Sequence, residues 1–402
     1  SYSEIYMRNI DVEFDIQKNY MGGIGYNFST QPQNVQPLSN VKFLQGSYLQ
    51  LIRDFNFSYL PKQLTFRTEM NRMINEKKLR NKSRGLVKLE TYVMKNWDWN
   101  RNYGLKWDLT QSLNLDFQAG AQAYIDEPQG LPDKGTDEYK MYRDSIVDEI
   151  FRLGSLDKYQ QMTSLNYRVP IDKIPLLDWI TLTSRYQADY FWNASPKSIR
   201  DRVGNSIEVS NTIQLNGDFN LESLYNKVPY FKRLNQKGDK GRGRGRQGIS
   251  QRQSRRSAQQ DNQSEEEQQA ADTTDQKPKK NYFKIVGEEF LKILMGLKKS
   301  SFSYSQTNGT FLPGFIPEPT ALGANWNYSP DTAMFSNTAY FKDNVPSSIA
   351  PGIGFVFGQQ KGLIDDAIKY GWISPDSLVT QSFATKFSDN FNFRASIEPI
   401  PD

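Results

Sequence analysis

Adjacent acidic residues are the groups in this sequence whose types and spacing fit acid–base chemistry. They occur at Asp137–Glu138, Glu288–Glu289 and Asp365–Asp366. Two carboxyl groups that share a pocket can act as general acid and general base. Each pair, however, lies in a polar, helix-like stretch, and no feature of the sequence brings two of them into one pocket. We therefore interpret the pairs as solvated helix residues.

Two residue types that often carry chemistry are missing, since the chain contains no His and no Cys. This removes the commonest general base and metal ligand, any Ser-His-Asp arrangement and any disulfide framework. The glycine-rich stretches MGGIGYNF from Met21 and APGIGFVFGQQ from Ala350 match neither a dinucleotide fingerprint nor a phosphate-binding loop. We expect no enzyme, and no catalytic, cofactor-binding or metal-binding residues.

A period of two dominates the pattern of side chains, as it does in β-strands. The stretch from Trp97 to Tyr124 places its large side chains on odd positions and polar ones, from Asp98 to Gln122, on nearly all even positions. It predicts two strands joined by the turn TQS at 110–112. Similar alternation begins at Leu64, Thr163, Ile180, Ile207 and Phe391, which are the starts of further predicted strands.

The predicted strands are long, and the connections between them alternate in length. We count about ten candidate strands, several of 11 to 14 residues, whereas strands of soluble proteins usually span about 5 to 6 residues and membrane strands need ~9 to 11. From Leu64 onward the short connections are 110–112 and 170–178. The long connections are 76–92, 125–160 and 193–206. Short and long connections in turn are typical of membrane β-barrels, with periplasmic turns and extracellular loops.

The sequence divides into three regions. Residues 1–234 are predicted to form barrel strands with extracellular loops, including a helical cap near 136–153 that begins at Thr136. Residues 235–280 form a low-complexity insert on the periplasmic side, and 281–402 an interfacial or periplasmic helix followed by further barrel strands. That helix either packs under the barrel wall or lies at the membrane interface.

The insert accounts for most of the positive charge of the chain. It holds eleven Lys or Arg and seven Asp or Glu, a balance of +4 out of a net +5, and Ile249 is its only large apolar residue. Such a segment cannot bury enough surface to offset the entropy of ordering, so we expect disorder. Its GRGRGR core resembles RNA-binding tracts, but we interpret it as a solvated linker and expect no nucleic-acid partner.

The two faces of the predicted sheet suggest a lipid-facing side and a lumen-facing side. No stretch approaches the ~20 apolar residues of a membrane helix, and mean hydropathy is -0.70, so a membrane protein of this composition would cross with strands. The residues expected to face lipid or to form aromatic girdles are Trp97, Trp99, Tyr103, Trp107, Phe117, Tyr186, Tyr190 and Trp192. The charged residues expected to face the lumen are Arg67, Glu69, Lys106, Asp108, Asp116, Arg168, Arg185, Asp189 and Arg394. Because both signs are present, we expect a hydrated passage for large cargo and no selective ion filter.

Five stretches carry a family resemblance. They are TEMNRMINEKKLRN from Thr68, LYNKVPYFKRL from Leu224, SYSQTNGTFLPGF from Ser303, APGIGFVFGQQ from Ala350 and FNFRASIEP from Phe391. They resemble the SprA/Sov family, the outer-membrane translocons of the Bacteroidota type IX secretion system, over most of the chain outside the insert. The resemblance implies that this chain is a segment of a much longer polypeptide that closes into a very large antiparallel transmembrane β-barrel.

The same resemblance implies a function and partners. Folded cargo proteins with a C-terminal secretion signal, among them gliding-motility adhesins, would pass from the periplasm to the cell surface. A PorV-like barrel would cover a lateral opening, a periplasmic plug protein would close the idle pore, and the lipid bilayer would surround the wall.

Two other classes of protein remain open from the sequence. A TonB-dependent small-molecule transporter is also a large barrel, but it needs a plug domain and an energy-coupling motif, which this stretch of sequence does not contain. A soluble β-sandwich that binds surfaces or sugars through aromatic platforms would also alternate with period two, because half-buried soluble sheets do so.

Overall fold

The fold is described from a computed structural model of the chain. It describes residues 1–82, 89–229, 296–330 and 346–397. The insert 235–280, the predicted helix after it and the pair Glu288–Glu289 lie outside the described residues, so those predictions stay untested.

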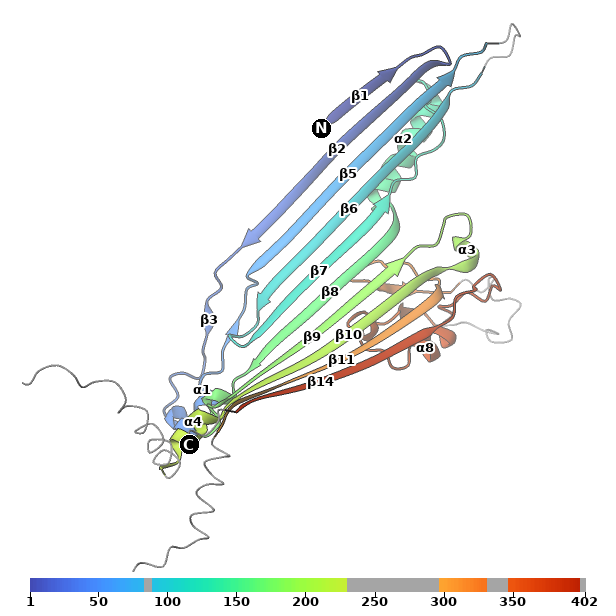
Figure 1. The fold of residues 1–402 in the computed structure, drawn as a ribbon. Coiled ribbons are helices and arrows are strands. Elements are labelled where there is room, and N and C mark those ends of the chain that lie inside the picture. Colours follow the sequence, from blue (N-terminus) through green and yellow to red (C-terminus); the bar gives the residue numbers. More distant parts are fainter. Residues whose placement is uncertain (83–88, 230–295, 331–345, 398–402) are drawn as a thin grey trace, which may run out of the picture. The chain divides into compact units, whose positions relative to one another are not determined.

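One antiparallel sheet of ten strands dominates the described residues (Figure 1). In sheet order the strands are β1 (Tyr2–Met7), β2 (Val12–Ser29), β5 (Gln63–Leu79), β6 (Tyr92–Asp108), β7 (Leu113–Tyr124), β8 (Ser155–Val169), β9 (Ile180–Asn193), β10 (Asn205–Asn220), β11 (Leu297–Phe315) and β14 (Ala384–Ile397). Sequential strands are neighbours throughout, apart from short elements inserted between them. The prediction of a mostly β protein with a few short helices is confirmed.

The register of the strands places the alternating polar and apolar side chains on opposite faces of the sheet. Lys106 of β6 lies opposite Asp116 of β7, while their neighbours Leu105 and Phe117 also form a pair. Residues opposite each other in a ladder point to the same side of the sheet. We call the side of Lys106 and Asp116 the polar face, and the side of Leu105 and Phe117 the apolar face.

The first two strands were not predicted. β2 contains Gly22, Gly23 and Gly25, and glycine is depleted in strands because it has no side chain to pack. Pairing explains their position here, since β2 is hydrogen-bonded along its length to β5. A Cβ on Gly23 would approach the carbonyl oxygen of Thr68 to 3.0 Å, so at least this glycine permits close approach of the strands.

The alternation of connections is confirmed from β5 to β10, whereas the next connection, 221–296, is long where a short one would follow. The short connections, 109–112 and 170–179, join the strands at one of their two ends, and we call this row of strand ends the short-turn edge (Figure 1). The long connections, 80–91, 125–154 and 194–204, lie at the opposite strand ends, which we call the long-loop edge. The pattern does not extend back to the N-terminal strands. There the tight connection 8–11 joins β1 to β2 at the long-loop edge, and the 30–62 connection between β2 and β5 is long.

The 30–62 connection braces the short-turn edge. It contains β3 (Asn34–Val35), η1 (Lys42–Gln45), η2 (Ser47–Leu49), α1 (Gln50–Arg53) and β4 (Phe57–Ser58). The buried Asn56 accepts a hydrogen bond from the Gln111 amide at 2.7 Å. The Trp107 indole donates to the Ser58 carbonyl at 2.9 Å. This segment therefore ties the tight β6–β7 turn to the sheet.

The helices are short, and the predicted cap helix is the longest one described. It is α2 (Asp137–Phe151), and Thr136 caps it by accepting a hydrogen bond from the Tyr139 amide at 3.2 Å. Acidic residues in its first turn interact favourably with the helix dipole. The remaining helical elements are η3 (Ile171–Lys173), α3 (Arg200–Val203), α4 (Leu221–Lys227), α7 (Ile353–Val356) and α8 (Leu363–Lys369).

A compact fold between β11 and β14 packs against the apolar face. We call residues 316–330 and 346–383 the cover; it includes β12 (Asn325–Tyr328), β13 (Ser348–Ala350), α7 and α8. Its buried Phe355, Val356 and Trp372 join Tyr190 and Ile207 of the sheet in one hydrophobic core. The cover is thus held by the same apolar alternation that forms the strands.

The chain separates into two compact units. The first comprises Ser1–Gly217 and Ser303–Asn392, and the second comprises Asp218–Phe302 and Phe393–Asp402. Within the second unit, the ring of Phe219 stacks on that of Phe302 at 5.8 Å. Apart from Arg394, every candidate site residue discussed below belongs to the first unit.

Candidate functional site: the two faces of the sheet

The polar face gathers eight of the nine charged residues predicted to line a passage. Four are basic and four are acidic: Arg67, Lys106, Arg168 and Arg185, against Glu69, Asp108, Asp116 and Asp189. Their strand registers place them on one face. Arg394 is exposed on β14, in the second unit. Whether the polar face borders a passage stays a prediction, but its formal charge from these eight residues is zero.

Four of these eight charges form ion pairs with near neighbours, and others accept hydrogen bonds from amide side chains. Arg67 donates through Nε to Glu69 at 2.9 Å, Lys62 lies 3.5 Å from Asp108, and the Gln187 amide donates to Asp189 at 3.0 Å. Such exposed pairs contribute little to stability, ~0–1 kcal/mol. Their effect is to keep the face hydrated without a strong field of either sign.

Amide side chains fill much of the space between the charges on the polar face. Asn102 and Gln118 border a hollow of about 380 Å³ whose lining also includes Arg67, Lys106 and Asp116. Gly104 and Thr65 also line the hollow, and the Thr65 hydroxyl occupies the place where a Cβ of residue 104 would stand. Amides and paired charges together present many hydrogen-bonding groups and no deep apolar pocket in this part of the face.

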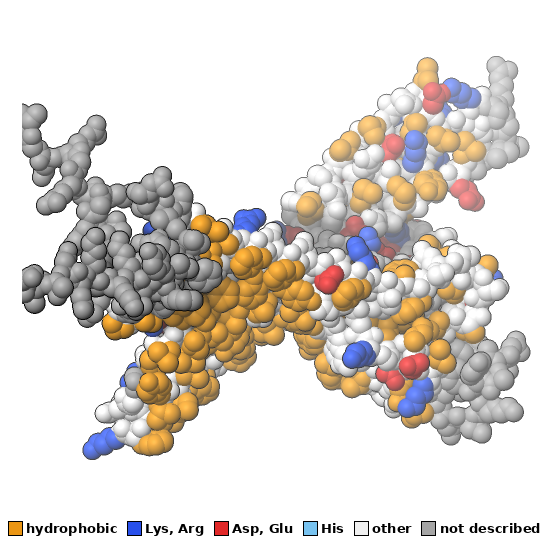
Figure 2. All heavy atoms as spheres, turned by 60° about the horizontal axis from the view of Figure 1, so that its bottom comes forward, with side chains coloured by type: hydrophobic (Ala, Val, Ile, Leu, Met, Phe, Trp, Pro, Cys, Tyr) orange, Lys and Arg blue, Asp and Glu red, His pale blue; other side chains and the backbone are white. Residues whose placement is uncertain are grey.

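The apolar face has an uncovered region toward the short-turn edge. Exposed side chains there include Tyr26, Phe28, Leu64, Tyr103 and Tyr167, with exposed fractions from 37% to 59%. Figure 2 shows a broad, nearly unbroken area of hydrophobic side chains on the surface turned toward the viewer. An apolar surface of this extent marks a contact with lipid or with another protein.

The height of this apolar belt can be measured along the strands. On β2 every apolar-face position from Tyr20 to Phe28 is uncharged, with Lys18 just beyond, and on β5 the apolar run from Leu64 to Met70 ends at Arg72. Nine residues rise about 31 Å along a strand, and about 22 Å along a barrel axis inclined by ~45°. This is close to the ~25 Å apolar band of outer-membrane barrels.

Some of the residues predicted to face lipid are buried by protein instead. Tyr190 and Trp192 have exposed fractions of 0%, and Trp99 of 8%, so these side chains contact protein. The Trp192 indole donates to the Pro317 carbonyl at 3.1 Å, and the Tyr186 hydroxyl donates to the Phe357 carbonyl. The prediction of a lipid-facing girdle is therefore wrong for Trp99, Tyr190 and Trp192, and protein covers part of Tyr186.

The other predicted girdle residues have mixed surroundings. Tyr103 is 40% exposed, and Phe117 packs partly buried against the core. The Trp97 ring lies under the Arg72 guanidinium at 4.9 Å, and Trp107 is held by Ser58. All four lie on the apolar face, and their contact with lipid stays a prediction.

Gly323 sets how closely the cover approaches the sheet. Its φ is +76°, and a Cβ there would lie 2.8 Å from the Tyr190 ring and 3.0 Å from the Tyr159 ring. We predict that Gly323→Ala lowers the free energy of unfolding by about 1–3 kcal/mol more than Gly362→Ala, because overpacking adds to backbone strain. Gly362 is the matched control, since its φ is +79° with open space around it. Chemical denaturation of both variants measures the difference, and equal losses would contradict the packing argument.

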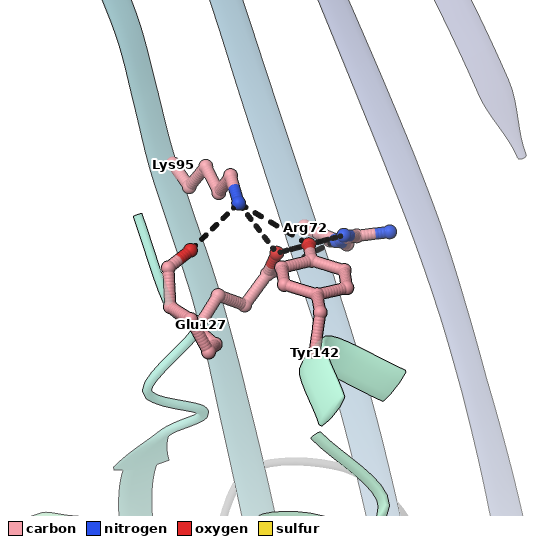
Figure 3. Close-up of polar contacts among 5 residues, drawn as sticks. Arg72, Lys95, Glu127 and Tyr142 are labelled. Carbon is pink, nitrogen blue, oxygen red and sulfur yellow. Dashed lines mark hydrogen bonds and ion pairs between the residues drawn. The ribbon is translucent and has the colours of Figure 1, made fainter. Parts of the chain in front are cut away.

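A buried ion cluster holds the long loop before β8 on the sheet at the long-loop edge (Figure 3). Glu127, 2% exposed, accepts two hydrogen bonds from Arg72 at 2.6 and 2.7 Å and one from the Tyr142 hydroxyl at 2.6 Å. Lys95 lies 3.8 Å from Glu127 and donates to the Pro128 carbonyl at 2.9 Å. Residues of β5, β6, the 125–154 connection and α2 thus converge on one carboxylate.

The cluster fixes the protonation of its loop residues. Burial alone would raise the pKa of Glu127, but the hydrogen bonds from Arg72 and Tyr142 and the charge of Lys95 hold that pKa below its ordinary value. Burial, together with the hydrogen bond to Glu127, raises the pKa of Tyr142 to about 12. The carboxylate is therefore ionised and the phenol protonated throughout the neutral range, as a structural cluster requires.

Two of the acidic pairs lie where helix geometry accounts for them. Asp137 and Glu138 occupy the first turn of α2, and Asp365 and Asp366 the first turn of α8. Among the described residues, no three His, Cys, Asp or Glu side chains gather closely enough to hold a metal ion. None of the helices described is long and apolar enough to cross a membrane.

Sequence reasoning missed three charged residues on the apolar face. Arg72 and Lys95 belong to the ion cluster, and Arg101 stands among aromatic residues on β6 with an exposed fraction of 7%. Their positions in the alternation are a usable signal, because a charge on the apolar side of a strand must have a partner or lie outside the apolar belt.

Comparison of the chain with models of protein families gave no match, and comparison with curated proteins gave none either.

Proposed function

We propose that this chain forms part of the wall of a protein-conducting channel in a bacterial outer membrane, as its resemblance to the SprA/Sov family implies. The observation that carries the proposal is the division of one long-stranded antiparallel sheet into a polar, amide-rich face and an apolar face. In this function the polar face borders the passage, and the uncovered apolar belt contacts lipid.

The polar face suits a large, varied cargo. The eight charges predicted to line the passage sum to zero, and both signs alternate along the face, so we expect cargo of either sign to meet no strong opposing or attracting field. Amide groups exchange hydrogen bonds with water as readily as with a passing surface. A folded protein can therefore slide along such a wall without being held.

The strand lengths support a membrane wall that extends beyond the bilayer. β2, β5 and β6 have 18, 17 and 17 residues, whereas ~9–11 suffice to cross. The excess lies toward the long-loop edge, where the apolar face turns charged at Arg72 and Lys95. We assign this edge to the cell surface and the short-turn edge to the periplasm.

The proposed partners follow the same resemblance. Cargo proteins with a C-terminal secretion signal, including gliding adhesins, would use the polar face, while a PorV-like barrel and a periplasmic plug protein would bind elsewhere on the complete wall. The proposed location is the outer membrane of a Bacteroidota-type cell.

Thiol labelling tests which face meets water. The chain has no Cys, so single cysteines report one site each, and Tyr26/Asn27 and Tyr167/Asn166 are adjacent exposed pairs on opposite faces. In intact outer membranes, we expect a hydrophilic maleimide to label Asn27→Cys and Asn166→Cys about tenfold or more faster than Tyr26→Cys and Tyr167→Cys. The reason is that an apolar environment suppresses the reactive thiolate.

The outcomes separate the alternatives. Faster labelling at the tyrosine positions would reverse the assignment of passage and lipid, and equal labelling would favour a water-exposed sheet such as a β-sandwich. A photoreactive group at position 166, but not at 167, should crosslink to a folded cargo stalled in transit. Crosslinks to small substrates alone would favour a transporter of the TonB-dependent kind.

A further inference from the structure

A cavity of about 730 Å³ lies between the apolar face and the cover. Its floor is formed by the small side chains Ala119 and Ala121 of β7, and one wall by residues 318–323 of the cover. Toward the short-turn edge, Tyr103 and Phe117 line it and continue into the exposed apolar belt. The cavity is thus mostly apolar and adjoins the surface that we assign to lipid.

One charged side chain in this cavity has no balancing acid. Arg101 is only 7% exposed, and its buried Nε has no hydrogen-bond partner. No ion pair to Arg101 occurs within the part of the chain that the structure describes. The other two charges in the lining are paired, Arg152 with Asp148 at 2.9 Å and Glu318 with Arg200 at 3.9 Å.

The ring of Trp99 lies 4.9 Å from the Arg101 guanidinium carbon. This cation–π contact occupies one face of the guanidinium and leaves its N–H edge available, because hydrogen bonds form in the plane of the group. A buried cation without an anion is costly, so the geometry favours an anionic group at this edge. Phosphate oxygens match the guanidinium fork.

Two leucines at the cavity adopt backbone conformations that are unusual for them. Leu153 has φ 67° and Leu322 has φ 49°, and these are the only non-glycine residues with positive φ among the described ones. Both line the cavity and remain 51% and 49% exposed. Strained backbone of this kind clusters at ligand sites, where the ligand contact depends on it. Here the strain holds two apolar side chains at the wall.

We propose that this cavity binds an anionic phospholipid, with its phosphate at Arg101 and an acyl chain between the leucines and the apolar belt. The proposal rests on the placement of the apolar face in the membrane given above. It goes further than the proposed function, because it assigns a specific lipid to the cavity between the sheet and the cover.

Lipid binding by the full-length protein in neutral detergent tests the proposal. The probes are dioleoyl phosphatidylglycerol, dioleoyl phosphatidylcholine and inorganic phosphate, and native mass spectrometry and fluorescence titration measure retention and affinity. We expect phosphatidylglycerol to bind about tenfold or more tighter than phosphatidylcholine, with Arg101→Gln removing that preference. Arg67→Gln, on the exposed polar face, is the matched control and should leave it unchanged.

Thermal unfolding gives a second measurement, because a lipid-binding role and a purely structural role of Arg101 predict opposite shifts of the melting temperature. Without lipid, Arg101→Gln should raise the melting temperature, because it removes an unbalanced buried charge, and added phosphatidylglycerol should no longer raise it further. An arginine with only a structural role would give a lower melting temperature. Unchanged phosphatidylglycerol binding in Arg101→Gln, or competition by inorganic phosphate at the concentration of the lipid, would overturn the lipid site.

A variant in the lining of the cavity tests the proposal if Arg101→Gln does not fold. Leu322→Gly relieves the positive φ and should retain the preference for phosphatidylglycerol over phosphatidylcholine, while reducing the advantage of dioleoyl over dihexanoyl phosphatidylglycerol. Equal chain-length dependence in this variant and the wild type would contradict the acyl-chain contact. Thiol labelling at positions 26, 27, 166 and 167 tests the channel proposal and does not involve Arg101. Failure of the channel proposal can therefore be distinguished from failure of the lipid site.

Discussion

Replacing Trp192 by alanine is expected to release the cover from the sheet. The side chain is 0% exposed and its indole donates to the Pro317 carbonyl at 3.1 Å. Truncation of a buried tryptophan costs about 3–5 kcal/mol, through lost transfer energy and the cavity left behind. A tryptophan in contact with lipid would lose much less, because lipid refills the space. Hydrogen exchange of the cover in the full-length protein measures the loss of protection.

Trp326 provides the matched comparison for Trp192. It belongs to the cover, its indole donates to the Ala321 carbonyl, and it is 43% exposed. Trp326→Ala should change the protection of the cover by less than about 1 kcal/mol, since truncation near the surface leaves no cavity. If both variants exchange at the wild-type rate, the cover is not held by Trp192 and the corrected surroundings of that residue are in error.

Glu127→Gln is expected to detach α2 and the connection before it from the long-loop edge. Arg72 and Lys95 would remain buried without their anion, and removal of one partner from a buried ion pair costs about 3–5 kcal/mol. Hydrogen exchange across 125–154 should rise, while β6 and β7 keep their protection. Asp137→Asn is the control, because that carboxylate is 91% exposed and forms an exposed pair with Lys140. Equal exchange in the two variants would contradict the role of the cluster.

The same cluster gives a pH dependence with a defined sign. The folded-state pKa of Glu127 lies below its ordinary value, so its contribution to stability is complete above the unfolded value of ~4.3. The contribution is lost as the pH falls through the lower folded value. Between these values α2 should stay docked in the wild type, and acid titration followed by hydrogen exchange records its release.

Much of the sheet follows from alternation alone. Side chains of a strand point to alternate sides, so the stretch from Trp97 to Tyr124 assigns each residue to a face without knowledge of its partners. The register then confirms the pairs, such as Leu105 with Phe117. The helix at Thr136 was predictable for a similar reason, because a capping residue and first-turn acids are local signals.

What covers a face is not encoded in the strand itself. Tyr190 and Trp192 are residue types of a membrane girdle. Tyr190 nevertheless packs under Gly323 and Phe355, and Trp192 donates to Pro317, all more than a hundred residues later in the chain. Aromatic side chains are buried equally well by lipid and by protein. Period and residue type therefore predict the face, while its occupant depends on contacts between distant segments.

Arg101 shows a second limit of prediction from sequence. It interrupts the aromatic run of β6, and the period of two predicts the strand whether or not this one position is charged. Only the surrounding side chains show that it is buried without an acid, with the nearby charges already paired. The chemistry of the cavity thus depends on what is absent near one residue.

The attachment of the cover also bears on how the sheet adds its last strand. Between β11 and β14 lie 68 residues (316–383), but the Ile316 amide donates to the Trp372 carbonyl and the Ser374 amide to the Gly314 carbonyl, at 2.8 and 2.7 Å. Once these two hydrogen bonds have formed, the connection that remains before β14 is residues 375–383. Shortening a loop from 68 to nine residues reduces the entropy cost of closure by about 1.8 kcal/mol. The cover thereby converts a distant strand pairing into a nearly local one, and β14 joins the sheet most readily after the fold before it has formed.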